Sequence, residues 1–195
     1  MHGKRILYQL IFIFLMIVPA VAGTEGNAER QATIDELTAT TTEKSLIVFG
    51  TLENSFTSEM IEILHSGIAL RFSFFVELYK ATDKWPKELV ATRTFQHIMT
   101  FDTLKENYKV TLEEDNNTVL SFRSLFEAQK VINDINGVKI VDLKQLLPDN
   151  RYSLRIRAEL YQKTLPLSLH NILPFLSWWD VKTDWHSITF TYQAS

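Results

Sequence analysis

The sequence predicts a mainly β protein: a single antiparallel β-sandwich of the immunoglobulin-like kind with two short helices, placed after an N-terminal signal segment. Three observations predict it. Apolar and polar residues alternate with a period of two over most of the chain. Two short stretches have a helical period instead, and an apolar run that follows basic residues stands at the amino end.

The first 22 residues have the layout of a signal peptide. Lys4 and Arg5 precede an apolar run over residues 6–18, and small residues around Pro19 follow as a cleavage site. We predict a signal peptide over residues 1–22, cleavage before Gly23 and a periplasmic location. The alternative is an uncleaved anchor in the inner membrane that faces the periplasm. The run is shorter than the roughly 20 apolar residues that a spanning helix needs, which favours cleavage.

The remaining chain divides into a flexible tail over residues 23–31, which lacks large apolar side chains, and a sandwich domain over residues 32–195. Alternation is clearest in residues 71–79 and 152–160, and each of these segments presents one apolar and one polar face. Weaker strand patterns cover residues 32–40, 44–52, 89–101, 108–114, 118–123, 138–143 and 187–193. Asp115, Asn116 and Asn117 predict a hairpin turn between two of these strands.

Two segments predict short helices. Residues 57–66 place their apolar side chains on one side, and Gly67 follows as a left-handed C-cap. Residues 125–136 begin after Ser124, which forms a capping box with Glu127, and we expect Gly137 to end this helix.

Composition excludes several classes of function. The chain has 20 basic and 23 acidic residues, a net charge of −3. Removal of the signal segment takes Lys4 and Arg5 away and lowers this to −5. A mildly acidic protein is expected to bind nucleic acid and anionic lipid surfaces poorly, because binding to either requires clustered Lys and Arg. There are no cysteines, so disulfides, thiolate metal sites and cysteine nucleophiles are excluded.

Catalytic or metal chemistry has one weak candidate. Asp180, Asp184 and His186 could supply an oxygen-rich metal or proton-transfer site, and thereby an unrecognised hydrolase. We favour a turn between Trp179 and Trp185 in which the aspartates cap backbone amides. No serine lies in a G-x-S-x-G elbow. We therefore predict that the protein is not an enzyme and has no catalytic, cofactor-binding or metal-binding residues.

Two surface features are candidates for binding. Arg71, Arg93, Arg155 and Arg157 lie on alternating segments and could form a basic patch. The alternative is that they pair across strands with acids such as Glu77 and Glu159. The second feature is residues 165–179, in which apolar and aromatic side chains surround two prolines. These residues either pack over an open end of the sandwich or form an exposed surface that faces a partner.

The C-terminal part of the sequence resembles an uncharacterised family of exported bacterial proteins, domain of unknown function 4390. The stretch from Trp179 to Trp185 (WDVKTDW) resembles its C-terminal signature, and matching stretches include VELY over residues 76–79 and RAEL over residues 157–160. The resemblance covers roughly Ile34 to Tyr192. It assigns no catalytic residues. It implies an exported bacterial protein, often encoded beside a membrane sensor kinase of the nitrogen-regulation type.

Together these observations lead to two hypotheses of function. The first is a non-enzymatic periplasmic binding or accessory domain in envelope signalling, whose protein partner is a membrane sensor kinase and whose binding edge is residues 165–185. The second is a carrier that holds a lipid or a small apolar ligand between its two sheets. Contact with the membrane is expected only through an uncleaved N-terminal segment.

Overall fold

The computed structural model describes residues 31–82, 87–160 and 181–193. All the described residues belong to one compact unit, which spans residues 31–195. Its elements, in chain order, are β1 (Thr33–Thr41), β2 (Ser45–Glu53), α1 (Ser58–His65), β3 (Leu70–Lys80), β4 (Leu89–Asp102), β5 (Asn107–Leu112), β6 (Thr118–Phe122), α2 (Leu125–Asn133), β7 (Asp134–Asp142), the 3-10 turn η1 (Leu143–Gln145), β8 (Arg151–Leu160) and β9 (His186–Thr191).

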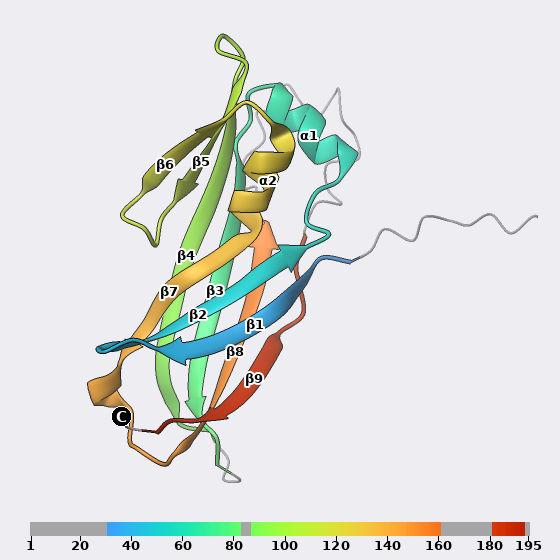
Figure 1. Cartoon of the computed structure of the whole chain (residues 1–195). Coiled ribbons are helices and arrows are strands. Elements are labelled where there is room, and N and C mark those ends of the chain that lie inside the picture. The colour runs from blue at the N-terminus through green and yellow to red at the C-terminus, as the bar shows by residue number, and fades with distance from the viewer. Residues whose placement is uncertain (1–30, 83–86, 161–180, 194–195) are drawn as a thin grey trace, which may run out of the picture. The chain divides into compact units, whose positions relative to one another are not determined.

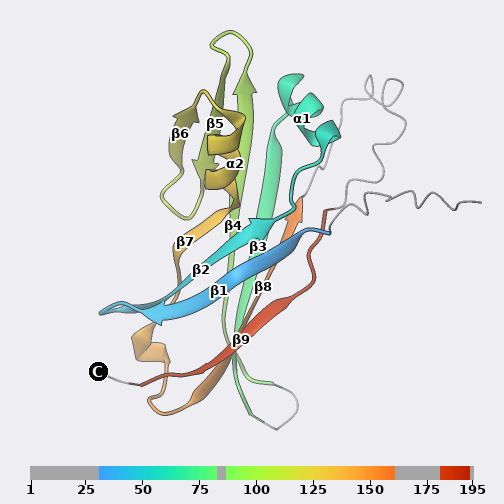
Figure 2. The ribbon, with the colours of Figure 1, turned by 45° about the vertical axis from the view of Figure 1, so that its right-hand side comes forward.

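The strands form two antiparallel sheets. The smaller has the order β1-β2-β7, and the larger has the order β6-β5-β4-β3-β8-β9. In both ribbon views the smaller sheet crosses one face of the larger one obliquely (Figures 1 and 2). The structure confirms the predicted mainly β fold with two short helices. Each segment predicted as a strand overlaps a strand of the structure.

The core lies between the two sheets. Strand β3 sits in the middle of the larger sheet, and its inward side chains Phe72, Phe74, Val76 and Leu78 are each at most 1% exposed. Phe74 lies directly opposite Phe95 of β4, and the two rings stack with their centroids 5.0 Å apart. This packing needs no disulfides, because each fully buried large apolar side chain contributes roughly 1.5–3 kcal/mol.

Helix α1 has the predicted limits. Thr57 is its N-cap, and the Thr57 hydroxyl accepts a hydrogen bond from the backbone N–H of Met60 at 3.4 Å. Gly67 follows the helix with φ +90°, the left-handed conformation that glycine adopts at least cost.

Helix α2 ends earlier than the sequence predicted. It stops at Asn133, and the next three residues already belong to β7. In the pairing of β7 with β2, Asp134 lies opposite Thr51 and Ile135 lies opposite Gly50. These residues are therefore extended and cannot continue the helix. Gly137 therefore lies inside a strand instead of ending the helix, and the Ser124 side chain makes no capping hydrogen bond.

The predicted hairpin turn is confirmed between β5 and β6. Asn116 and Asn117 both have positive φ, 51° and 58°, which is the conformation of a type I′ turn. The N–H of Thr118 donates to the carbonyl of Asp115 at 2.9 Å and closes the turn.

Several predictions fall on residues outside the described part. They are the signal peptide over residues 1–22, most of the tail over residues 23–31, and the aromatic and proline-containing stretch over residues 165–179. In the described residues no helix combines the length and the apolar character needed to cross a membrane.

Candidate functional site

The outer face of the larger sheet carries a group of charged and aromatic side chains. Strands β3 and β8 pair so that Glu77 lies opposite Arg155 and Phe75 lies opposite Arg157. The intervening residues, such as Val76 and Ile156, point into the core and are at most 1% exposed. Alternation therefore places the two arginines together on the face that points away from the smaller sheet.

Glu77, Tyr79 and Arg155 form a closed hydrogen-bonded triad. Arg155 donates to Glu77 Oε2 from Nε at 2.7 Å and from Nη2 at 2.6 Å. The Tyr79 hydroxyl donates to the same oxygen at 2.7 Å and accepts from Arg155 Nη2 at 3.1 Å. Each side chain thus contacts the other two, which fixes the guanidinium plane.

This triad shifts two pKa values in opposite directions. Burial acts to raise the pKa of Glu77, but the hydrogen bonds from Tyr79 and Arg155 outweigh it and hold the pKa below its ordinary value. The hydrogen bond to Glu77, with burial, raises the pKa of Tyr79 above its ordinary value. Both shifts favour the state with an ionised carboxylate and a neutral phenol.

Trp185 is the second centre of the group. The guanidinium carbon of Arg155 lies 4.4 Å from the ring centroid of Trp185, and that of Arg157 lies 4.7 Å from it. Arg155 also approaches the Tyr79 ring and Arg157 the Phe75 ring, each with its guanidinium carbon 5.1 Å from the ring centroid. Cation–π contacts of this kind are worth about 0.5–1 kcal/mol at exposed sites.

The backbone around residue 183 places Trp185. The Leu160 N–H donates to the Val181 carbonyl at 2.7 Å, and the Thr183 N–H donates to the Ala158 carbonyl at 2.9 Å. The buried Thr183 hydroxyl accepts from the Ala158 N–H at 2.9 Å. The chain therefore returns to β8 as an extended segment, and Trp185 follows just before β9.

We call the whole group the Arg–Trp cluster. A second ion-pair set completes it: Glu159 Oε1 accepts from Arg157 and from Lys182, both at 3.1 Å. The members are Phe75, Glu77, Tyr79, Arg155, Arg157, Glu159, Lys182 and Trp185. Three cations and two carboxylates give the cluster a net charge of +1, on a chain whose total is −3.

The structure corrects the predicted four-arginine patch. Arg155 and Arg157 lie on the outer face together with Arg71, but Arg93 lies opposite Val76 and therefore on the other face of the sheet. The alternative, pairing with acids across strands, is confirmed for Arg155. Arg157 instead pairs with Glu159 two residues along its own strand.

Two of the three predicted acidic and histidine candidates, Asp184 and His186, lie in the described part of the chain. Asp180 lies outside the described residues. Asp184 and His186 are both exposed, and the described chain contains no group of three His, Cys, Asp or Glu residues that could hold a metal ion. The described part of the predicted turn, residues 181–185, lies extended beside β8 instead.

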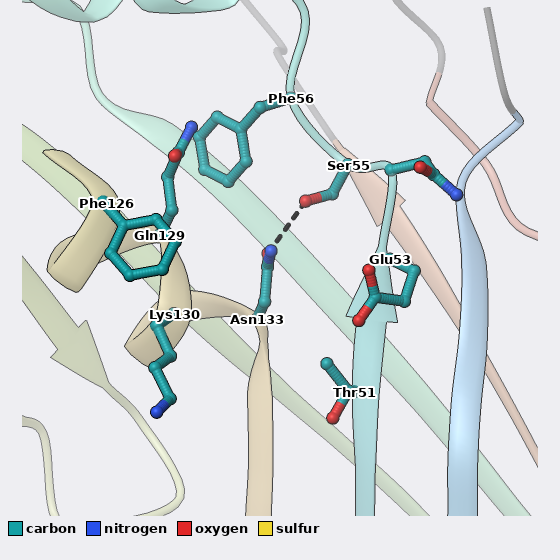
Figure 3. A pocket seen from close by; sticks show the side chains of 9 residues that line it. Thr51, Glu53, Ser55, Phe56, Phe126, Gln129, Lys130 and Asn133 are labelled. Atoms are coloured by element: carbon teal, nitrogen blue, oxygen red, sulfur yellow. Dashed lines mark hydrogen bonds between the residues drawn. The ribbon is translucent and has the colours of Figure 1, made fainter.

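A pocket of about 490 Å³ lies elsewhere, between α2 and the end of β2. Phe56, which follows β2, and Phe126 of α2 both line it, and the Ser55 hydroxyl donates to Asn133 Oδ1 at 2.8 Å (Figure 3). Its wall also includes Thr51, Glu53, Asn54, Gln129 and Lys130. This pocket lies beside α2 and the end of β2, not between the two sheets, so it does not support a carrier cavity between the sheets.

Sequence analysis missed a buried polar pair in the core. His97 of β4 is fully buried, and its Nε2 lies 2.8 Å from Glu114 Oε1. Its Nδ1 donates to the carbonyl of Ile132, in the last turn of α2, at 2.6 Å. The polar Glu-Glu-Asp stretch before the hairpin turn was the only signal, and it gave no reason to connect Glu114 with a histidine on another strand.

The fold and the cluster define a class of protein: a two-sheet antiparallel β domain with a preformed arginine and aromatic surface on its larger sheet. The chain belongs to the family described as Domain of unknown function (DUF4390), whose model matches residues 29–189. This confirms the resemblance noted from the sequence. No curated protein and no solved structure matches the chain.

Proposed function

We propose that the protein is an exported, non-enzymatic domain that binds a protein partner through the Arg–Trp cluster. The partner that we propose is the extracytoplasmic region of a membrane sensor kinase, so that the domain acts as an accessory in envelope signalling. The supporting observation is the position of Trp185 between Arg155 and Arg157, at 4.4 and 4.7 Å.

The composition of the cluster supports a binding role. Trp, Tyr and Arg are the residues most often found at the energetic centre of protein interfaces. Here the three types stand together on an outer sheet face, where they add nothing to the core between the sheets. Arg155 and Arg157 keep 39% and 25% of their side-chain area exposed, so part of each side chain is accessible to a partner, although Arg157 Nε is buried.

The arrangement also supports tight binding, because the side chains are already held. Arg155 is fixed by Glu77 and Tyr79, and Arg157 is fixed by Glu159. Ordering a rotamer-rich side chain at an interface costs roughly 0.5–1.5 kcal/mol. A partner that meets arginines held in one geometry avoids much of this cost. The net charge of +1 favours a partner surface with carboxylates and aromatic rings.

The proposed location rests on the N-terminal segment and the family match. The charged and apolar layout of residues 1–22 supports export, and the match begins at residue 29, after this segment. N-terminal sequencing of the protein from its own host tests the location. A chain that starts at Gly23 supports a released periplasmic domain. A membrane-bound chain that still starts at Met1 supports the anchored alternative, and a cytosolic chain contradicts export.

Photo-crosslinking in living cells tests the partner. A photoreactive residue at position 182 lies at the border of the cluster, and we expect it to crosslink a membrane sensor kinase. Trp185→Ala should reduce the crosslinked product at least about tenfold, which corresponds to the loss of 1.4 kcal/mol or more at an interface centre. His186→Ala is the matched control, because His186 is the exposed neighbour and lies outside the cluster.

Two outcomes would overturn this proposal. One is a crosslinked partner whose yield is the same for Trp185→Ala and for the control, with both variants folded by circular dichroism. The other is a crosslink only to proteins that are not membrane sensors.

A further inference from the structure

Strand β6 differs from the other edges of the two sheets. The edge strands are β1 and β7 in the smaller sheet and β6 and β9 in the larger one. Strand β1 carries Asp35 and Glu36 at an irregularity in its pairing, and Glu36 has φ 54°. Charges and bulges of this kind protect an edge from pairing with another chain. Strand β9 lies beside β1, and β7 contacts β4.

No such protection is present on β6. Its sequence over residues 118–122 is TVLSF, which contains no charge and no proline. Val119 and Leu120 are 57% and 37% exposed, and they lie on opposite faces of the strand. In both ribbon views the edge of β6 away from β5 has no described strand beside it (Figures 1 and 2). An exposed apolar edge strand is a template for pairing with another strand.

We propose that β6 pairs with β6 of a second copy of this chain, antiparallel and about a two-fold axis at Leu120. In this register Leu120 faces Leu120 of the second copy, and Val119 faces its Ser121. The charges at the two ends of β6 favour this occupant. An acidic turn of sequence EEDNN, residues 113–117, precedes the strand, and Arg123 follows it.

Antiparallel pairing joins these opposite charges. It places Arg123 of one copy opposite residue 117 of the other, within reach of the acidic turn that contains Asp115. The two-fold axis repeats this contact at the other end of the pair. Arg123 and Asp115 are both exposed, and the ion pairs of the described residues involve other side chains.

The dimer leaves the Arg–Trp cluster free. The cluster lies on β3, β8 and the segment before β9, toward the opposite edge of the larger sheet from β6. A pair of copies would therefore present two clusters from one continuous sheet. The inference is independent of the proposed function, since self-association is measured without any partner.

Sedimentation velocity of the purified protein, over a wide range of concentration, tests the proposal. We expect a species of twice the chain mass. Leu120→Lys places two lysines opposite each other across the axis, so it should raise the dimer dissociation constant at least about tenfold. Val119→Lys should act in the same direction. Leu104→Lys is the matched control, because Leu104 is 95% exposed but lies between β4 and β5, and it should leave the dimer unchanged.

A charge exchange tests the register. Arg123→Asp should weaken the dimer, and the double variant Arg123→Asp with Asp115→Arg should restore it. Circular dichroism confirms that each variant is folded. A protein that stays monomeric at every concentration overturns the proposal. So does a dimer that is unaffected by both lysine variants on β6, or one that the charge exchange fails to restore.

Discussion

His97 and Glu114 face each other across the inside of the larger sheet, with 2.8 Å between His97 Nε2 and Glu114 Oε1. The register explains the contact: His97 lies opposite Leu112, and Glu114 follows two residues later. The second carboxyl oxygen of Glu114 is buried and has no hydrogen-bond partner among the described residues. The pair therefore joins β4, the β5–β6 hairpin and the last turn of α2 through a single imidazole.

Replacement of this imidazole should be costly. His97→Phe keeps a ring of similar size but leaves the Ile132 carbonyl and the Glu114 carboxyl without their hydrogen-bond partner. Each buried group that loses its partner costs about 1–3 kcal/mol, so we expect a loss of roughly 3 kcal/mol in the free energy of unfolding. Urea denaturation measures it. His186→Phe, at an exposed position, should change stability by less than about 0.5 kcal/mol. Equal effects of the two substitutions would contradict a structural role for the pair.

The triad of Glu77, Tyr79 and Arg155 predicts a pH dependence with two limits. The lowered pKa of Glu77 adds stability that is fully present above the ordinary value of 4.5 and is lost as the pH falls through the folded pKa. The raised pKa of Tyr79 adds stability that is fully present below the ordinary value of 10.0 and is lost as the pH rises through the folded pKa.

Glu77→Gln removes the contribution of Glu77 and the largest cause of the raised pKa of Tyr79, its hydrogen bond to the Glu77 carboxylate. The difference in unfolding free energy between wild type and this variant should be largest between pH 4.5 and 10.0 and should shrink on either side. Urea denaturation at a series of pH values measures the difference. A difference that does not change with pH would show that the two shifts do not contribute to folding.

The contact between Arg155 and Trp185 should appear as a coupling energy. In a double-mutant cycle with Arg155→Ala and Trp185→Ala, we expect the two losses of stability to be non-additive by about 0.5–1 kcal/mol. The cycle with Arg71→Ala and Trp185→Ala is the control, because Arg71 makes no cation–π contact among the described residues. Additive losses for Arg155 and Trp185 would mean that their stacking is energetically neutral.

Two glycines should differ in how substitution by alanine changes the stability of the protein. Gly67→Ala places a side chain at φ +90° and should destabilise the protein by roughly 1 kcal/mol, although no atom lies within 4 Å of the new methyl group. Gly50→Ala meets its nearest neighbour, the Asp35 carbonyl oxygen, at an ordinary 3.5 Å. It should be neutral or slightly stabilising. Thermal unfolding of both variants distinguishes backbone strain from crowding.

Most of the strands could be predicted because they bury a single face, as residues 71–79 illustrate, and this burial requires apolar residues at every second position. The C-terminal end of α2 could not be predicted, because the residues after Asn133 pair with β2, which is distant in the sequence. The Arg–Trp cluster depends on two such facts, the register of β3 against β8 and the return of the chain at Thr183. Alternation indicated that Arg155 and Arg157 share a face, but nothing local connected them with Trp185.

The hydrogen bond from the Leu160 N–H to the Val181 carbonyl brings together two residues that are 21 positions apart in the sequence. Leu160 and Val181 are therefore held together by the backbone of β8 and the segment that follows residue 180. Closing a chain segment costs only about 0.6 kcal/mol more each time its length doubles. A connection between these two residues can thus change in length at little cost in chain entropy, so a peptide inserted there should leave the two sheets folded.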